Sequence, residues 1–157
     1  MNWLPWMPLC AACLHIFEEF AWPGGFADWY RRYKPSRAKS LTPRFLVIVN
    51  ALFLILCYDA GAARSQPFGA GLWLGVAALL AGNAVWHLIG SVKTRSYSPG
   101  VITGSLLYIP LAVFGYVRLV RLSKAGIGAA ALAVVVGGSY HGWSAVFHGL
   151  RARPRDQ

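Results

Sequence analysis

Acidic residues are scarce in this 157-residue chain, which has five Asp and Glu against fifteen Lys and Arg. Charged residues of either sign make up only 13 % of the sequence, whereas a water-soluble domain carries roughly a quarter. Hydrophobic residues reach 57 %, and the charges cluster so that long apolar runs remain between them. These proportions exclude an ordinary soluble domain and indicate an integral membrane protein, with residues 1–157 forming a single transmembrane domain.

Cysteine is also scarce, and the three cysteines of the chain exclude a disulfide-stabilised scaffold. Cys10 and Cys13 form a CxxC pair, which in soluble folds suggests thiol redox chemistry. Two alanines separate them and no second thiol pair follows, so we interpret them as small helix-packing residues. The N-terminal stretch lacks a basic region, so no cleaved signal peptide is expected.

Five apolar segments have about the 20 residues that a spanning helix needs. Between the first two lies a segment, residues 26–43, that mixes basic and aromatic residues as membrane–water interfaces do. The predicted fold class is therefore all-α, a polytopic membrane helix bundle with five transmembrane helices. The predicted helices cover residues 3–22, 44–62, 69–92, 101–122 and 125–150.

The distribution of basic residues predicts an N-out/C-in orientation in the cell inner membrane. With the N-terminus outside, eleven of the fifteen Lys and Arg residues face the cytoplasm, in the 26–44 connection, the 93–100 loop and the C-terminal tail. Because these residues lie at the ends of apolar segments, we interpret the net charge of +10 as topology signals and contacts with lipid headgroups. Nucleic-acid binding is not expected.

Polar residues inside the predicted spans gather at one depth. They occur late in the inward-running segments and early in the outward-running ones, which places all of them in the cytoplasmic half of the membrane. Ionisable groups at this depth are expensive and mark functional sites. The set is His15, Glu18, Glu19, Asn50, Asn83, His87, Thr103, His141 and His148. On a helix, Glu18 lies about 60° to one side of His15 and Glu19 about 40° to the other, so these three share a face.

Imidazoles and carboxylates at a common depth predict a divalent-metal site, since zinc, iron and manganese all accept such ligands. The predicted ligands are His15, Glu18, Glu19, His87 and His141. Glu18 and Glu19 are also the predicted catalytic residues, with one of them able to act as a general base. Residues expected to orient a ligand or to contact substrate are Asn50, Asn83, Tyr97, Ser98, Thr103, Tyr108, Tyr140 and His148.

Two other interpretations of this polar set stay open. The histidines could be neutral, hydrogen-bonded groups that hold helices together. Alternatively, a desolvated glutamate and a histidine could form a metal-free acid/base pair that isomerises or cyclises an apolar substrate. The turn Tyr97–Gly100 precedes the fourth segment, whose first free N–H groups could hold an anion or could simply begin a helix.

Three ordered motifs give the chain a family resemblance. They are His15-Ile16-Phe17-Glu18-Glu19, Asn83-x-x-x-His87 and Tyr97-Ser98-Pro99-Gly100-Val101-Ile102-Thr103. In order and spacing they resemble the HXXEE family of small polytopic bacterial membrane proteins, over about residues 14–110. The family is named for its motif, so the resemblance implies a shared site without supplying a reaction.

The function expected from these observations is a membrane-embedded, metal-dependent enzyme, a hydrolase or an oxygenase, acting on a lipid-like or apolar substrate from the bilayer. Hydrolysis would use a metal-bound water with a glutamate taking its proton, and oxidation would use iron at the same ligands. No nucleotide cofactor is expected, and the chain could act within a homo-oligomer or larger membrane complex. A metal-free isomerase and a non-enzymatic subunit of a membrane complex are the alternatives.

Overall fold

The computed structural model describes residues 3–151, except the side chains of residues 145 and 147–151, and in this part every regular element is a helix. Three helices are long and apolar enough to cross a membrane. They are α3 (Pro43–Ala62), α4 (Gly69–Thr94) and a continuous helix from Val101 to Arg121. The last comprises α5 (Val101–Thr103), a π-helical segment η4 (Gly104–Tyr108) and α6 (Ile109–Arg121).

The first and fifth predicted spans are shorter or interrupted. The first is a 3₁₀ turn, η1 (Leu4–Trp6), followed by the 14-residue α1 (Met7–Phe20). It ends before Pro23, Gly24 and Gly25, where the two glycines adopt φ angles of 71° and 85°. The fifth is divided at Ser139 into α7 (Ile127–Gly138) and α8 (Tyr140–Arg151), each of 12 residues. The described part of the chain therefore contains three helices of spanning length where the sequence predicts five.

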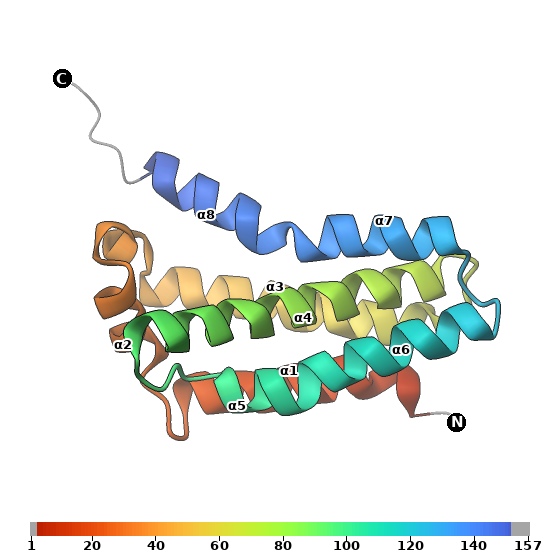
Figure 1. Ribbon diagram of the computed structural model, residues 1–157, viewed down its shortest axis with the longest axis horizontal. Helices are drawn as coiled ribbons and strands as arrows, with labels where there is room; N and C mark the ends of the chain where they lie inside the picture. Colours follow the sequence, from red (N-terminus) through yellow and green to blue (C-terminus); the bar gives the residue numbers. More distant parts are fainter. Residues whose placement is uncertain (1–2, 152–157) are drawn as a thin grey trace.

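Helix α4 lies at the centre of the bundle. It packs against α1, α3, α6, α7 and α8, and Figure 1 shows α7 and α8 on one side of it and α1 and α6 on the other. Small residues permit the closest approaches: a Cβ on Gly137 of α7 would clash with the Gly75 carbonyl oxygen of α4. Such small-residue contacts are typical of helix packing in membranes.

The basic and aromatic segment forms α2 (Phe26–Tyr33) and the 3₁₀ helix η2 (Pro35–Ser40) at one end of the bundle (Figure 1). Trp29 and Tyr30 are buried, and their rings lie 5.6 Å from that of Trp86 on α4. Helix α3 follows after Thr42, whose hydroxyl accepts a hydrogen bond from the Phe45 backbone N–H. The aromatic residues thus anchor α2 to the bundle, while Arg31 and Arg32 remain exposed.

The outer faces of the helices are apolar. Val47, Ile48 and Ile55 of α3 are exposed, as are Ile127 and Val136 of α7. Only 17 % of an apolar 18-residue stretch of helix α3 is buried inside the molecule. A surface of this kind suits contact with lipid chains rather than with water.

Candidate metal centre

Helix α1 carries His15, Glu18 and Glu19 into the interior of the bundle. The relative exposures of these three residues are 1 %, 5 % and 6 %, and His87 of α4 is 1 % exposed. The spacing of three and four residues places them on one helical face, as the sequence predicts. Burying two carboxylates is costly unless each one finds partners, and the two acids find different ones.

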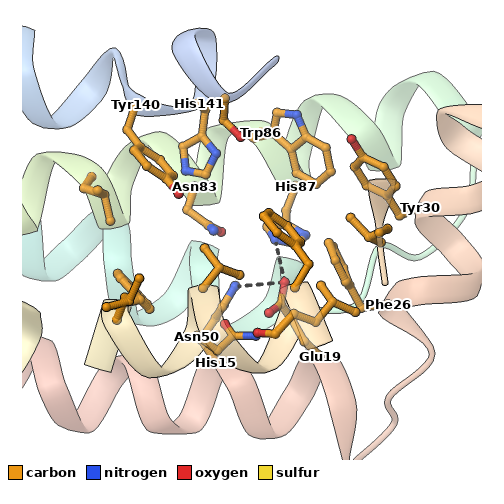
Figure 2. Close-up of a pocket in the computed structure, with 18 of the residues that line it drawn as sticks. His15, Glu19, Phe26, Tyr30, Asn50, Asn83, Trp86, His87, Tyr140 and His141 are labelled. Atoms are coloured by element: carbon orange, nitrogen blue, oxygen red, sulfur yellow. Dashed lines mark hydrogen bonds and ion pairs between the residues drawn. The ribbon is translucent and has the colours of Figure 1, made fainter. Parts of the chain in front are cut away.

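Glu19 lies between two imidazoles (Figure 2). Its Oε1 atom is 3.2 Å from Nε2 of His87 and 3.6 Å from Nε2 of His15. The two rings meet edge to face, with their centroids 5.1 Å apart. One ligand atom from each of His15, Glu19 and His87 can be chosen so that all three lie within 4.8 Å of one another. These three side chains therefore form a buried group able to hold a metal ion.

Glu18 faces the turn before α5 and lies outside this group. Its Oε1 accepts hydrogen bonds from the Tyr97 hydroxyl at 2.6 Å and the Ile102 N–H at 3.0 Å. Its Oε2 accepts the N–H of Thr103 at 2.7 Å and the Thr103 hydroxyl at 2.5 Å. Four donors occupy both oxygens of an ionised carboxylate, which accepts and does not donate. Glu18 is thus held as a hydrogen-bonded anion at a helix start. Its predicted roles as a metal ligand and catalytic residue stay predictions.

The Thr103 hydroxyl determines which nitrogen of His15 carries hydrogen. Its only hydrogen is donated to Glu18, so it must accept the second contact, 2.9 Å from Nδ1 of His15. The proton of a neutral His15 is therefore on Nδ1. Nε2 then carries a lone pair, lies buried and has no hydrogen-bond partner among the described residues. Glu18 and Thr103 together direct a basic nitrogen toward Glu19.

The second imidazole has a similar support. Nδ1 of His87 lies 2.9 Å from the hydroxyl of Ser98, which is completely buried in the turn. A serine hydroxyl can donate or accept, so His87 can present either a proton or a lone pair at Nε2. The same turn contains Gly100, with φ at 99°. A Cβ there would lie 2.7 Å from Cε1 of His15 and 2.9 Å from Cε1 of His87, so only glycine lets the turn approach both rings.

Tyr97 completes the support of Glu18 from outside the helices. Desolvation and the hydrogen bond to the Glu18 carboxylate raise the pKa of the Tyr97 hydroxyl well above its ordinary value. The hydroxyl therefore stays protonated and continues to donate to Glu18.

Comparison with known proteins matches this constellation to one family. Residues 6–115 match the model of a family described as a protein of unknown function with an HXXEE motif. The chain belongs to the HXXEE family. No curated protein and no solved structure matches it.

The HXXEE motif therefore combines two functions on one helical turn. Its histidine and second glutamate, His15 and Glu19, face His87. Its first glutamate, Glu18, binds the segment from Tyr97 to Thr103. The match covers α1 through most of α6, so it includes every residue of the three-membered group and its supports.

We call the three side chains of His15, Glu19 and His87 the HXXEE group. Beside this group lies a cavity of about 350 Å³. His15, Glu19 and His87 lie on its wall, and Figure 2 shows Tyr140 and His141 on the opposite side from His15 and Glu19, with Asn83 beside His87 on α4. Most of its other lining is apolar. The apolar residues are Phe20, Phe26, Leu41, Phe45, Leu46, Val49, Leu52, Phe53, Leu56, Leu79 and Trp86.

Several residues predicted for the site line this cavity without joining the HXXEE group. His141, predicted as a ligand, lies on α8 and its buried Nε2 has no hydrogen-bond partner among the described residues. Oδ1 of Asn83 is also buried and has no hydrogen-bond partner among the described residues. The Asn50 side chain donates a hydrogen bond to the Leu46 carbonyl at 2.9 Å. Tyr140 lines the cavity. The His148 side chain lies outside the described residues.

Tyr108 lies on the other side of the HXXEE histidine. Its ring centroid is 4.6 Å from that of His15, and the side chain is completely buried. It belongs to the π-helical segment η4, and such segments often occur at functional sites. Tyr108 packs against the imidazole and is not part of the cavity lining.

Arg37, Tyr30 and Phe26 also line the cavity, although none of them was predicted for the site. Their segment has the basic and aromatic composition of a membrane–water interface. That composition does not predict that α2 packs against α4 and that α2 and η2 line the cavity. The aromatic residues of this segment, Phe26, Trp29, Tyr30 and Tyr33, recur at helical spacing on one face, and this pattern is the signal that the sequence offers.

Proposed function

We propose that the His15–Glu19–His87 group is the metal centre of a membrane-embedded enzyme acting on an apolar or lipid-like substrate. The observation that carries the proposal is the position of His15 Nε2, which is buried, lies 3.6 Å from Oε1 of Glu19 and has no hydrogen-bond partner among the described residues. Leaving such an atom without a partner costs about 1–3 kcal/mol. A divalent cation between Nε2 of His15, Glu19 and Nε2 of His87 would remove this cost and the repulsion between lone pair and carboxylate.

The ligand number supports a catalytic rather than a structural centre. Two imidazoles and one carboxylate leave at least one coordination position for water or substrate, whereas structural zinc sites have four protein ligands. The same donor set suits iron(II) in oxygenases. Nδ1 of His15 and of His87 each contact a hydroxyl at 2.9 Å, the kind of contact that orients metal-bound imidazoles.

The residues of the chain would divide the work as follows. A bound zinc ion would supply an acidic water for hydrolysis, whereas bound iron would supply redox chemistry. Glu19 would bind through one oxygen and could accept a proton with the other. The apolar cavity beside the group would hold the substrate and keep bulk water away.

For the membrane arrangement, we propose that α1 and the α7–α8 pair complete a five-pass bundle in the inner membrane. The N-terminus would face outward and the C-terminus the cytoplasm. The distribution of basic residues supports this orientation. The HXXEE group would then lie in the cytoplasmic half of the bilayer.

Elemental analysis of the full chain, purified in detergent, tests the metal centre. We expect about one zinc, iron or manganese ion per chain in the wild type, since three protein ligands form a high-affinity site. Glu19→Gln and His87→Ala should each lose the ion. Asp59→Asn, at an exposed carboxylate, and His141→Ala, outside the group, should retain it. Trace metal in the wild type, unchanged in folded Glu19→Gln and His87→Ala, would refute the proposal.

A metal-free acid/base enzyme is the second candidate. The contact of 3.2 Å between Glu19 Oε1 and His87 Nε2 supports it, because this pair could pass a proton to and from a substrate. Such an isomerase or cyclase would remain fully active in EDTA. The metal-dependent enzyme would lose activity in EDTA and regain it when the lost metal is added back.

A further inference from the structure

The cavity beside the HXXEE group has a cation in its wall. Arg37 of η2 lines the cavity and is partly buried. It lies near Tyr30, another lining residue: burial raises the pKa of Tyr30, and the guanidinium of Arg37 opposes that rise. A neutral tyrosine hydroxyl and a guanidinium therefore line the same part of the cavity.

No carboxylate in residues 3–151 is placed to neutralise Arg37. Asp28 pairs with Arg31 at 2.7 Å, and Glu18 and Glu19 have the partners described above. Asp59 lies near the far end of α3, about 25 Å along the helix from its start at Pro43. A partly buried guanidinium in a mostly apolar cavity is costly without an anion, so the missing partner points to a ligand.

The apolar wall of the cavity runs along α3. Phe45, Leu46, Val49, Phe53 and Leu56 line the cavity at helical spacing, so they form one stripe of α3 about 16 Å long. The stripe begins five residues after η2, the element that carries Arg37. The cavity therefore combines a cation near one end of α3 with a long apolar surface running away from it.

Helices α3 and α8 both line the cavity, yet they are not among the pairs of helices that pack closely against each other. Helix α8 packs mainly against α4 and η2, whereas α3 packs mainly against α1 and α4. Tyr140, His141 and Ser144 of α8 nevertheless line the same cavity as α3. A molecule dissolved in the bilayer could therefore enter between these two helices.

We propose that the cavity binds a single-chain amphiphile with an anionic head, a carboxylate or a phosphate, pairing the head with Arg37 and Tyr30 and the chain with the α3 stripe. As a substrate assignment it rests on the function proposed above, since the bound chain would lie beside the HXXEE group. As a binding site it stands on the cavity, on a guanidinium that has no carboxylate partner in residues 3–151, and on the apolar stripe alone.

Native mass spectrometry of the full chain in detergent tests the head-group preference. Oleate and oleyl phosphate should bind one per chain, about tenfold or more tightly than oleyl alcohol or oleylamine, because the charge-assisted bond to Arg37 is present only with an anion. The oleate and oleyl phosphate arms distinguish the two anionic heads. Butyrate and inorganic phosphate, which lack the chain, should not bind at the same concentrations.

Two matched pairs of variants locate the ligand. Arg37→Gln should weaken oleate binding about tenfold and leave oleyl alcohol unchanged, whereas Lys39→Gln, exposed on the same 3₁₀ helix, should change neither. Val49→Trp should fill the cavity and block both ligands. Val47→Trp, on the exposed face of α3, should not. Equal binding of all four oleyl compounds, or equal effects within either pair of variants, would overturn the proposal.

The metal proposal and the ligand proposal fail separately in these experiments. Arg37→Gln should retain the wild-type metal content while losing oleate selectivity. Glu19→Gln should lose the metal and yet bind oleate at least as tightly as the wild type, because one negative charge has left the cavity wall. Loss of oleate selectivity in Glu19→Gln but not in Arg37→Gln would place the head at the HXXEE group and contradict the assignment to Arg37.

Discussion

At the scale of single residues, two adjacent and equally buried glutamates have different partners. Glu18 accepts four hydrogen bonds from the segment 97–103, whereas the polar partners of Glu19 among the described residues are imidazole nitrogens. Adjacent positions on a helix point about 100° apart, so one helical turn can serve two neighbouring elements. Glu18 thus fixes Thr103, and Thr103 in turn fixes the proton of His15.

Removing the Thr103 hydroxyl should weaken metal binding without removing a ligand. In Thr103→Val, Nδ1 of His15 loses its acceptor, so the Nε2 lone pair is no longer maintained. Loss of such a supporting contact typically costs 10–100-fold in metal affinity. Competition with a chromophoric chelator measures the change in Kd. Thr103→Ser retains the hydroxyl and should restore affinity to within about threefold of the wild type; equal losses in both variants would show that the methyl group, not the hydroxyl, matters.

The sequence predicts this site only in part, and the reasons are geometric. The spacing of His15, Glu18 and Glu19 predicts a shared buried face, which the structure contains. Which glutamate joins the histidines depends on where the 97–103 segment docks, and no local pattern encodes that contact. His141 lines the cavity, but its helix begins only after the break at Ser139, so the predicted depth alone could not place it beside His87.

At the scale of helices, hydropathy locates the apolar segments better than it locates their interruptions. Predicted residues 44–62 correspond to α3 (Pro43–Ala62), and 69–92 to α4 (Gly69–Thr94). Residues 125–150 read as one apolar run, yet Gly137, Gly138 and Ser139 divide them into α7 and α8. Glycine and serine are tolerated in membrane helices, so their presence does not reveal a break whose position depends on the contact with α4.

The contact between α7 and α4 supplies a prediction that uses two neighbouring glycines. Gly137→Ala would direct a Cβ at the Gly75 carbonyl oxygen and the Ala78 side chain, whereas Gly138→Ala meets nothing within 4 Å. The first should lower the free energy of unfolding by about 1–3 kcal/mol. The second should leave it unchanged or raise it slightly, since alanine favours helix over glycine by roughly 1 kcal/mol. Thermal melts in detergent compare the two, and equal Tm values would mean that α7 does not pack on α4 at Gly75.

At the scale of the whole molecule, the apolar exterior and the distribution of charge define a bundle with unlike ends. The basic residues of α2 and η2, Arg37 among them, lie at one end of the bundle. The exposed faces of α3 and α7 are apolar. The cavity lies between these features, beside the HXXEE group. In the orientation proposed above, an amphiphile in the cytoplasmic leaflet would meet the guanidinium at headgroup level and the α3 stripe at the level of its chain.

This arrangement requires that α1 and the α7–α8 pair cross the bilayer, although neither is an uninterrupted helix of spanning length. With five passes, each terminus lies on the opposite side of the membrane from the loop nearest to it in the sequence. Trp3 is then on the opposite side from Ser36, and the C-terminus is on the opposite side from Lys124. With three passes, made by α3, α4 and the Val101–Arg121 helix, each terminus shares a face with its neighbouring loop.

Single cysteines placed in a variant with Cys10, Cys13 and Cys57 replaced by alanine distinguish these topologies. With a membrane-impermeant maleimide on intact cells, we expect labelling at Trp3→Cys and Gln66→Cys, and protection of Ser36→Cys and of a cysteine appended after residue 157. Permeabilised cells, in which all four positions should react, provide the control. Protection of Trp3→Cys together with labelling of the appended cysteine would leave three passes and place η1 in the cytoplasm. His15 and Glu19 would then lie on a helix that enters the bilayer without crossing it. The positive residues of the tail would face outward, against the charge rule.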